Sequence, residues 1–140
     1  MKTTLALLLA ASLAVACSSS VSPDASSGVT LTTTSSTPPL PSSASIRGAG
    51  DSVVATVVAA ATCGKTLSAD AAVTPGRLVI TISLTATAPQ NCLPIFASTT
   101  YRAVVHRLAA GSYDASVDYR SVFGTAVSDS TVARTTVALP

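Results

Sequence analysis

LVITISLT, residues 78–85, is the stretch that decides the fold, because large aliphatic side chains occupy every second position. One side of an extended chain would carry Leu78, Ile80, Ile82 and Leu84. The other side would carry Val79 and a run of hydroxyl residues, which suits a surface in water. This period of two predicts a β-strand with one buried face. Thr74-Pro75-Gly76-Arg77 comes just before it and has Pro and Gly where a type II turn places them.

The same alternation recurs on both sides of this segment. Residues 66–73 and 113–119 alternate small or apolar side chains with polar ones, and residues 53–60 form a Val- and Ala-rich run. Residues 101–108 and 131–139 are further strand candidates. Six or seven short strands at this spacing predict one antiparallel β-sandwich over residues 48–140. A small β-barrel is the alternative.

The composition allows one domain and argues against binding to nucleic acid. The chain has 140 residues, of which 48% are hydrophobic and 10% charged, and its formal net charge is +2. All of the acidic residues are Asp. Binding to nucleic acid needs clustered Lys and Arg, which the sequence does not contain.

Residues 1–16 have the pattern of an export signal. Lys2 precedes an apolar run from Leu5 to Ala16, which is too short to span a bilayer. Leu13-Ala-Val-Ala-Cys17 then resembles the lipobox of bacterial lipoproteins, although Ala14 stands where that family usually has Leu. The resemblance implies a precursor that is cleaved before Cys17 and lipidated on it. The alternative is ordinary cleavage after Ala16, with Cys17 a bystander.

The lipoprotein resemblance also implies a location. The protein would be held in the bacterial cell envelope by a lipid on Cys17, with its domain facing the periplasm or the exterior. Ser18 follows the cysteine in place of the Asp that commonly retains such proteins in the inner membrane. The outer membrane is therefore favoured if the host is Gram-negative.

Residues 17–47 are expected to form a disordered tether. Most of residues 18–45 are Ser, Thr or Pro, with few aliphatic side chains and one charge, Asp24. Such a composition buries too little apolar surface to offset the entropy of the chain. Thr37-Pro-Pro-Leu-Pro41 adds local polyproline stiffness.

Cys63 and Cys92 are the two cysteines that remain after the anchor. In an exported protein such a pair predicts a disulfide. Closing a loop of this length stabilises a domain by roughly 3–4 kcal/mol on the chain-entropy model. A metal or redox pair is the rival interpretation, but the sequence has no CxxC motif and a single histidine.

Leu108-x-x-Gly111-x-Tyr113 resembles a hairpin found in bacterial Ig-like and transthyretin-like modules. The resemblance implies that Gly111 makes the turn and that Tyr113 enters the next strand facing the core. It supports an Ig-like fold class and says nothing of function.

Two patterns invite a catalytic interpretation, and neither is sufficient. Gly50-Asp51-Ser52 is similar to the first block of the GDSL-type hydrolases, but the chain is too short for that fold and has no Asp-x-x-His block. A turn that starts a strand explains these residues better. His106 is the only histidine, and by parity it shares a strand face with Arg102, Val104 and Leu108. We expect a surface or sheet-edge histidine and no catalytic residue.

Other polar patterns predict neither a metal nor a cofactor. Asp114-x-Ser116-x-Asp118 has the spacing of a calcium loop, but Tyr119 and Thr125 stand where that loop needs Gly and Glu. These residues are better explained as the solvent face of a strand. Arg102, Arg107 and Arg120 are interpreted as scattered solvated positions.

The sequence therefore indicates a non-enzymatic, membrane-tethered domain with a binding or structural role. Its partner would be an envelope protein or a glycan, and the loop over residues 86–99, with Asn91, Pro94 and Phe96, is the favoured contact. The alternative for Phe96 is that it closes the core. The alternative functions are an accessory subunit or inhibitor of an exported enzyme, and a small exported hydrolase.

The anchor is tested by Cys17→Ala. We expect this variant to leave the membrane fraction or to accumulate as uncleaved precursor, because the lipid is attached through the thiol. Membrane fractionation and intact mass measure both outcomes. A variant that fractionates and migrates like the wild type contradicts the lipoprotein prediction.

Overall fold

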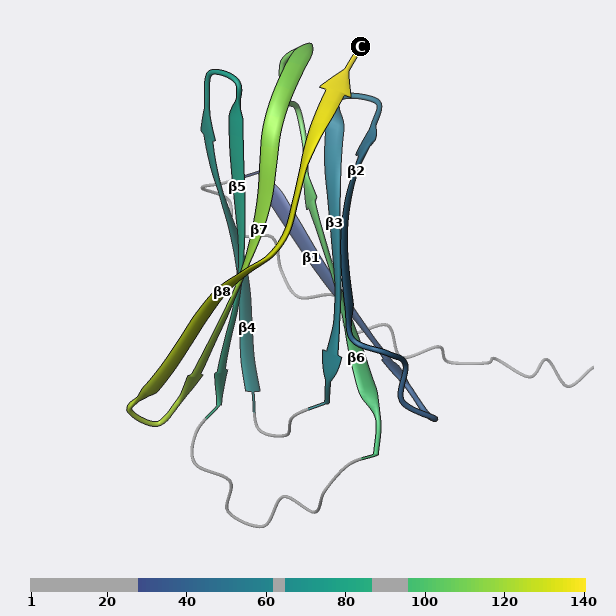
Figure 1. Cartoon of the computed structure of the whole chain (residues 1–140), viewed down its shortest axis with the longest axis vertical. Helices are drawn as coiled ribbons and strands as arrows, with labels where there is room; N and C mark the ends of the chain where they lie inside the picture. The colour runs from purple at the N-terminus through teal and green to yellow at the C-terminus, as the bar shows by residue number, and fades with distance from the viewer. Residues whose placement is uncertain (1–27, 62–64, 87–95) are drawn as a thin grey trace, which may run out of the picture.

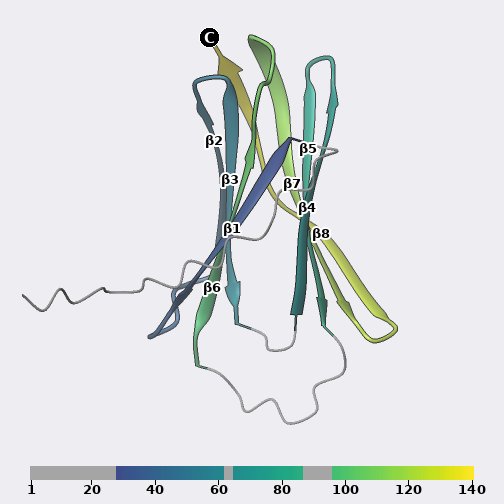
Figure 2. The same ribbon diagram turned by 180° about the vertical axis from the view of Figure 1, so that it is seen from behind.

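Two four-stranded β-sheets lie face to face in the computed structural model, which describes residues 28–61, 65–86 and 96–140 (Figures 1 and 2). Sheet A contains, in spatial order, β1 (Val29–Ser36), β6 (Ser98–Val105), β3 (Ser52–Ala60) and β2 (Ser43–Ala49). Sheet B contains β4 (Lys65–Thr74), β5 (Arg77–Ala86), β7 (Gly111–Phe123) and β8 (Ala126–Leu139). The predicted all-β sandwich is confirmed. No helix that could cross a membrane occurs among these described residues.

The core lies between the sheets and is built from the alternating side chains that the sequence indicates. Leu78, Ile80, Ile82 and Leu84 on β5 are fully buried. On sheet A they face Val53, Ala55 and Val57 of β3 and Tyr101, Ala103 and Val105 of β6. Each fully buried aliphatic side chain of this size contributes roughly 1.5–3 kcal/mol. Most of the hydrophobic stabilisation therefore comes from the inner strands of the two sheets.

The expected tether over residues 17–47 is wrong for the part of it that the structure describes. Residues 29–36 and 43–49 form β1 and β2, so the sandwich begins well before residue 48. Val29 and Leu31 are buried, and Thr30 between them and Thr32 after them lie on the outer side of the strand. Both strands lie at sheet edges, where a few inward side chains are enough, and Thr suits an extended backbone. Because Ser and Thr are so frequent in this segment, its alternation of inward and outward side chains was not apparent from the sequence.

The connections between strands also differ from the expectation. The described residues form eight strands: β3 to β8 lie within the predicted range 48–140, and β1 and β2 add two that begin before it. β5 pairs with β7 in parallel, so the sandwich is not wholly antiparallel. The segment from Leu108 to Tyr113 is not a hairpin, because it joins β6 of sheet A to β7 of sheet B. Tyr113 nevertheless faces the core as predicted, and its hydroxyl donates to Ala109 O at 2.9 Å. This bond resembles the tyrosine corner of other β-sandwiches.

Two turns form as the sequence predicts. Gly76 has φ +70° between Thr74 and Arg77, which pair across the β4–β5 hairpin. Gly50 has φ +60° and forms, with Asp51, the turn between Ala49 and Ser52 of the β2–β3 hairpin. Both glycines occupy the left-handed region that other residues rarely adopt.

The β7–β8 hairpin extends away from β4 and β5 at its tip (Figure 1). Its register shifts between Val117 and Asp118, which is the signature of a β-bulge. Residues 126–132 of β8, beyond this shift, are all exposed. The other half of β8 turns back towards the core, where Val137 and Leu139 are buried.

At the other side of the sandwich the edge strand β2 closes on β8, and Gly48 marks the point of closest approach. A Cβ atom at Gly48 would lie 3.0 Å from Val137 Cγ1 and 3.2 Å from Leu139 Cδ2. A groove of about 400 Å³ runs along this seam, between residues 46–50 and residues 135–140. The missing side chain therefore lets the two sheets approach each other here.

Gly48→Val tests this close approach. We expect a loss of about 1–3 kcal/mol in the free energy of unfolding, because the added methyl groups must displace buried neighbours. Gly48→Ala should cost less. Ser45→Val, on the outer side of the same strand, is the matched control for the change in strand propensity. Equal stabilities of Gly48→Val and Ser45→Val in chemical denaturation would refute the packing argument.

Candidate functional site on the outer face of sheet A

Three rows of side chains cross the outer face of sheet A. Because Val53, Ala55, Tyr101 and Ala103 face the core, the residues between them on β3 and β6 face outward. The paired positions give the rows Thr30–Val104–Val54–Arg47, Thr32–Arg102–Thr56–Ser45 and Thr34–Thr100–Val58–Ser43. The face is thus made of short hydroxyl and valine side chains and two arginines.

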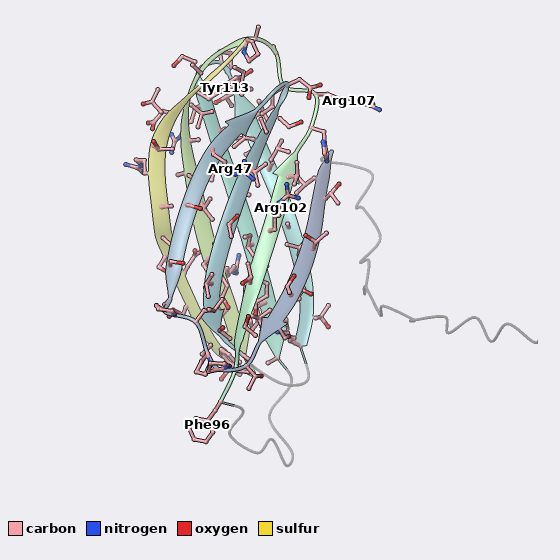
Figure 3. The ribbon with its side chains drawn as sticks, turned by 90° about the vertical axis from the view of Figure 1, so that its right-hand side faces the viewer. Arg47, Phe96, Arg102, Arg107 and Tyr113 are labelled. Atoms are coloured by element: carbon pink, nitrogen blue, oxygen red, sulfur yellow. The ribbon has the colours of Figure 1, made fainter. Side chains whose placement is uncertain are left out.

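The two arginines have no carboxylate beside them in the sheet. Arg102 is flanked across the strands by Thr32 and Thr56, and Arg47 is paired with Val54. Figure 3 looks onto this face and shows both arginines on the near side, with Arg107 at its upper end. Arg107 and Arg102 are exposed, and so is Arg47. Their charges are therefore available to a partner.

The valines of the top row are buried although they lie on the outer side. Val54 is 2% exposed and Val104 is 7% exposed, and neither belongs to the core between the sheets. Their cross-strand neighbours are Arg47 and Thr30. Long cationic side chains commonly lay their aliphatic stems over such apolar surface and keep the charged head in water. Arg47, as the cross-strand neighbour of Val54, is placed to cover this valine in that way.

The outer face of sheet B is arranged differently. There Arg77 is paired with Asp114, and Arg120 with Asp129. Cross-strand pairs of opposite charge neutralise each other. Asp70 and Asp118 add two more carboxylates, and Asp118 accepts a 2.7 Å hydrogen bond from Thr131 Oγ1. Sheet A therefore presents cations, whereas sheet B presents a balanced or acidic surface.

A polar cluster closes the upper end of sheet A, where Asp51, Ser52 and His106 come together. Ser52 Oγ donates to Asp51 Oδ1 at 2.9 Å and lies 3.4 Å from His106 Nδ1. His106 Nε2 lies 3.2 Å from Thr30 Oγ1. Backbone bonds from His106 N to Gly28 O and from Leu108 N to Asp51 O fix the same corner. Sequence reasoning named these residues separately and missed their contact, which follows from β3 and β6 being neighbours.

The contacts in this cluster differ from those of a catalytic triad. Ser52 Oγ lies between Asp51 Oδ1, at 2.9 Å, and His106 Nδ1, at 3.4 Å. A general base must present an unprotonated nitrogen to the nucleophile, with a carboxylate on its other nitrogen. That second nitrogen faces Thr30. The cluster ties β1, β3 and β6 together.

His106 shares its face with Arg102 and Val104 as predicted, but not with Leu108. Arg107 has φ +60°, which reverses the alternation, and Leu108 turns into the core. His106 itself is exposed. Ser116, expected on a solvent face between Asp114 and Asp118, is 6% exposed because β7 is an inner strand. Among the described residues no three His, Cys, Asp or Glu side chains gather as a metal site would require.

A second polar group lies between the sheets, near the ends of β3 and β5. Lys65 Nζ donates to Thr99 Oγ1 and to Tyr101 Oη, each at 3.2 Å, and lies 5.2 Å from the centre of the Tyr101 ring. Tyr119 packs against Tyr101 with ring centres 6.0 Å apart. Burial, and then the neighbouring Tyr101, raise the pKa of Tyr119 well above its usual value. Lys65 thus has partners for its charge where it enters the sandwich.

The predicted contact loop is described only at its end. Phe96 is 80% exposed and points away from the lower end of sheet A, so it does not close the core (Figure 3). Asn91 and Pro94 lie outside the described residues. So do Cys17, Cys63 and Cys92, and both the lipidation and the disulfide stay predictions.

Comparison with known proteins gives no relative. No family model matches the chain, and neither a curated protein nor a solved structure does.

Tyr119→Phe tests the burial of the Tyr119 phenol. A folded-state pKa above the unfolded one means that the native state keeps its proton when the unfolded chain loses it. The contribution to stability is complete below about pH 10 and is lost as the pH rises beyond that value. We expect Tyr119→Phe to make the alkaline fall in unfolding free energy shallower. Tyr113→Phe controls for the loss of one phenol, and an equal change in both variants would contradict the assignment.

Proposed function

We propose that this protein is a lipid-anchored component of the bacterial cell envelope whose sandwich binds an anionic partner through the outer face of sheet A. The observation that carries the proposal is the pair Arg47 and Arg102, which stand among hydroxyl and valine side chains without a carboxylate as cross-strand neighbour. The role is binding and not catalysis.

Arginine is well suited to this role. Its planar guanidinium donates several hydrogen bonds in a fixed geometry and matches carboxylate or phosphate oxygens. The threonine and serine hydroxyls around Arg102 add donors that can serve the same oxygens. Because these side chains are short, the arginines stand above a smooth surface. Such a face suits an extended anionic surface or chain more than a small enclosed ligand.

The contrast between the two sheets supports the choice of face. On sheet B, Arg77 and Arg120 have Asp114 and Asp129 as cross-strand neighbours, whereas Arg134 lies opposite Ser116. Two of the three arginines there therefore have a carboxylate directly across from them, so a partner would gain less by approaching this face. Sheet A carries Arg47, Arg102 and Arg107, with Asp51 at its upper corner. An anionic partner is attracted to the first sheet and not to the second.

The hydrolase interpretation is not favoured by the geometry at Ser52. Ser52, whose hydroxyl would act as nucleophile, is only 8% exposed, and this hydroxyl donates to Asp51 Oδ1. The Asp51 carboxylate also contacts Ser52 and not His106, whereas a triad carboxylate contacts the histidine. The cluster supports a structural role at the corner where β1, β3 and β6 meet.

Binding to isolated envelopes tests the proposal. The mature chain with Cys17→Ser lacks the lipid, so any retention reports the domain. We expect Arg47→Gln with Arg102→Gln to weaken binding by about thirtyfold, since each of the two cations near an anionic surface contributes roughly 1 kcal/mol. Glutamine keeps part of the aliphatic stem of each arginine and removes its charge.

Arg120→Gln with Arg134→Gln removes the same net charge from sheet B and is the matched control. We expect this variant to bind like the parent. If both double variants lose binding equally, only net charge matters and the proposed face is wrong. Circular dichroism of each variant establishes that the fold is retained.

A further inference from the structure

The distance between the anchor candidate and the domain is short. Because β1 begins at Val29, ten residues separate Cys17 from Gly28, where the sequence alone would allow a tether of about three times that length. Even a fully extended chain of this length reaches no more than about 40 Å. If Cys17 carries the lipid, sheet A cannot be far from the bilayer surface.

The tether also joins the domain at sheet A, which is the sheet with the proposed binding face. β1 is an edge strand of sheet A, and its first residue, Val29, pairs with Val105 beside the His106 corner. The face with Arg47 and Arg102 therefore belongs to the sheet that the anchor holds. Sheet B, with Asp70, Asp114, Asp118 and Asp129, lies on the opposite side of the core.

Exposed apolar side chains lie at the lower end of this sheet. Phe96 is 80% exposed and Leu40 is 47% exposed. The two are close along the edge of the fold, because Leu40 N donates to Ser98 Oγ at 2.8 Å. Aromatic and cationic side chains on one face are typical of surfaces that lie in the headgroup region of a membrane, and here Phe96 lies at the end of the face opposite to Arg107 (Figure 3).

We propose that the anionic partner is the phospholipid surface of the membrane that holds the anchor, and that the domain lies on it with the outer face of sheet A against the headgroups. This inference rests on the proposed function and names its partner. Arg47, Arg102 and Arg107 contact lipid phosphates, and Phe96 enters the interface at one end. The outer face of sheet B, on which four Asp outnumber three Arg, points away from the anionic bilayer.

Vesicle binding of the unlipidated mature chain (Cys17→Ser) tests the electrostatic part. We expect co-sedimentation with vesicles containing about one third phosphatidylglycerol and at least about tenfold less with pure phosphatidylcholine. Arg47→Gln with Arg102→Gln should lose most of the binding, whereas Arg120→Gln with Arg134→Gln should keep it. Equal losses in the two variants, or equal binding to both kinds of vesicle, would overturn the inference.

A fluorescent reporter tests the orientation. The chain contains no tryptophan, so Phe96→Trp supplies a single probe at the end of sheet A. Its emission should shift to shorter wavelength on phosphatidylglycerol vesicles. Phe123→Trp, at the exposed tip of the β7–β8 hairpin, is the matched control and should not shift. Phe123 belongs to sheet B, so a shift at Phe123 and none at Phe96 would mean that the other sheet lies on the membrane.

The two proposals fail in different ways. If envelopes bind the parent but not the Arg47/Arg102 variant, and phosphatidylglycerol vesicles bind neither, the face is right and the lipid is wrong. The partner is then another anionic component, such as an acidic glycan. If the two arginines affect neither envelopes nor vesicles, the proposed function itself fails.

Discussion

The burial of one side of β5 is the constraint on which the rest of the molecule depends. Its four large aliphatic side chains are fully buried, and no other strand of the part of the chain that the structure describes buries as many Leu and Ile side chains. The chain has few aromatic residues to add to this core. Because side chains alternate along a strand, fixing the inward set fixes the outward set as well. The rows of hydroxyls and arginines on sheet A are a consequence of this register. A slip of one residue in β6 would place Arg102 in the core.

The two outer faces show that the same core can support different surfaces. On sheet B, charges of opposite sign meet across neighbouring strands, and such pairs add a few tenths of a kcal/mol to 1 kcal/mol each. On sheet A, Arg102 stands between threonines and gains nothing comparable from its neighbours. Stability alone does not account for a face of this kind. We therefore place function on sheet A.

Much of the fold could be predicted from residues 66–85 and 113–119, where apolar and polar side chains alternate cleanly. The edge strands β1 and β2 could not, because two or three inward side chains in a Ser/Thr-rich segment do not stand out from a linker. The parallel pairing of β5 with β7 depends on contacts far apart in sequence, which alternation does not report. The contact between Ser52 and His106 could not be predicted, because it depends on β3 and β6 being neighbours in the sheet. Arg47 was not recognised as a candidate, because it lies in the segment that was expected to be a tether. The sequence signal that could have identified β2, and with it Arg47, was the alternation of Ala44, Ser45, Ile46 and Arg47.

The bulge in the β7–β8 hairpin has a consequence for how the protein behaves when many copies are crowded together. β8 is a long edge strand, and an unbroken edge of unpaired backbone groups is a template on which another chain can add as a strand. The register shift at Val117 and Asp118 interrupts that template midway, and Asp129 places a charge on the exposed half. Copies held side by side at high local concentration would meet a bent, charged edge. The irregularity protects a β-rich protein from growing into fibres.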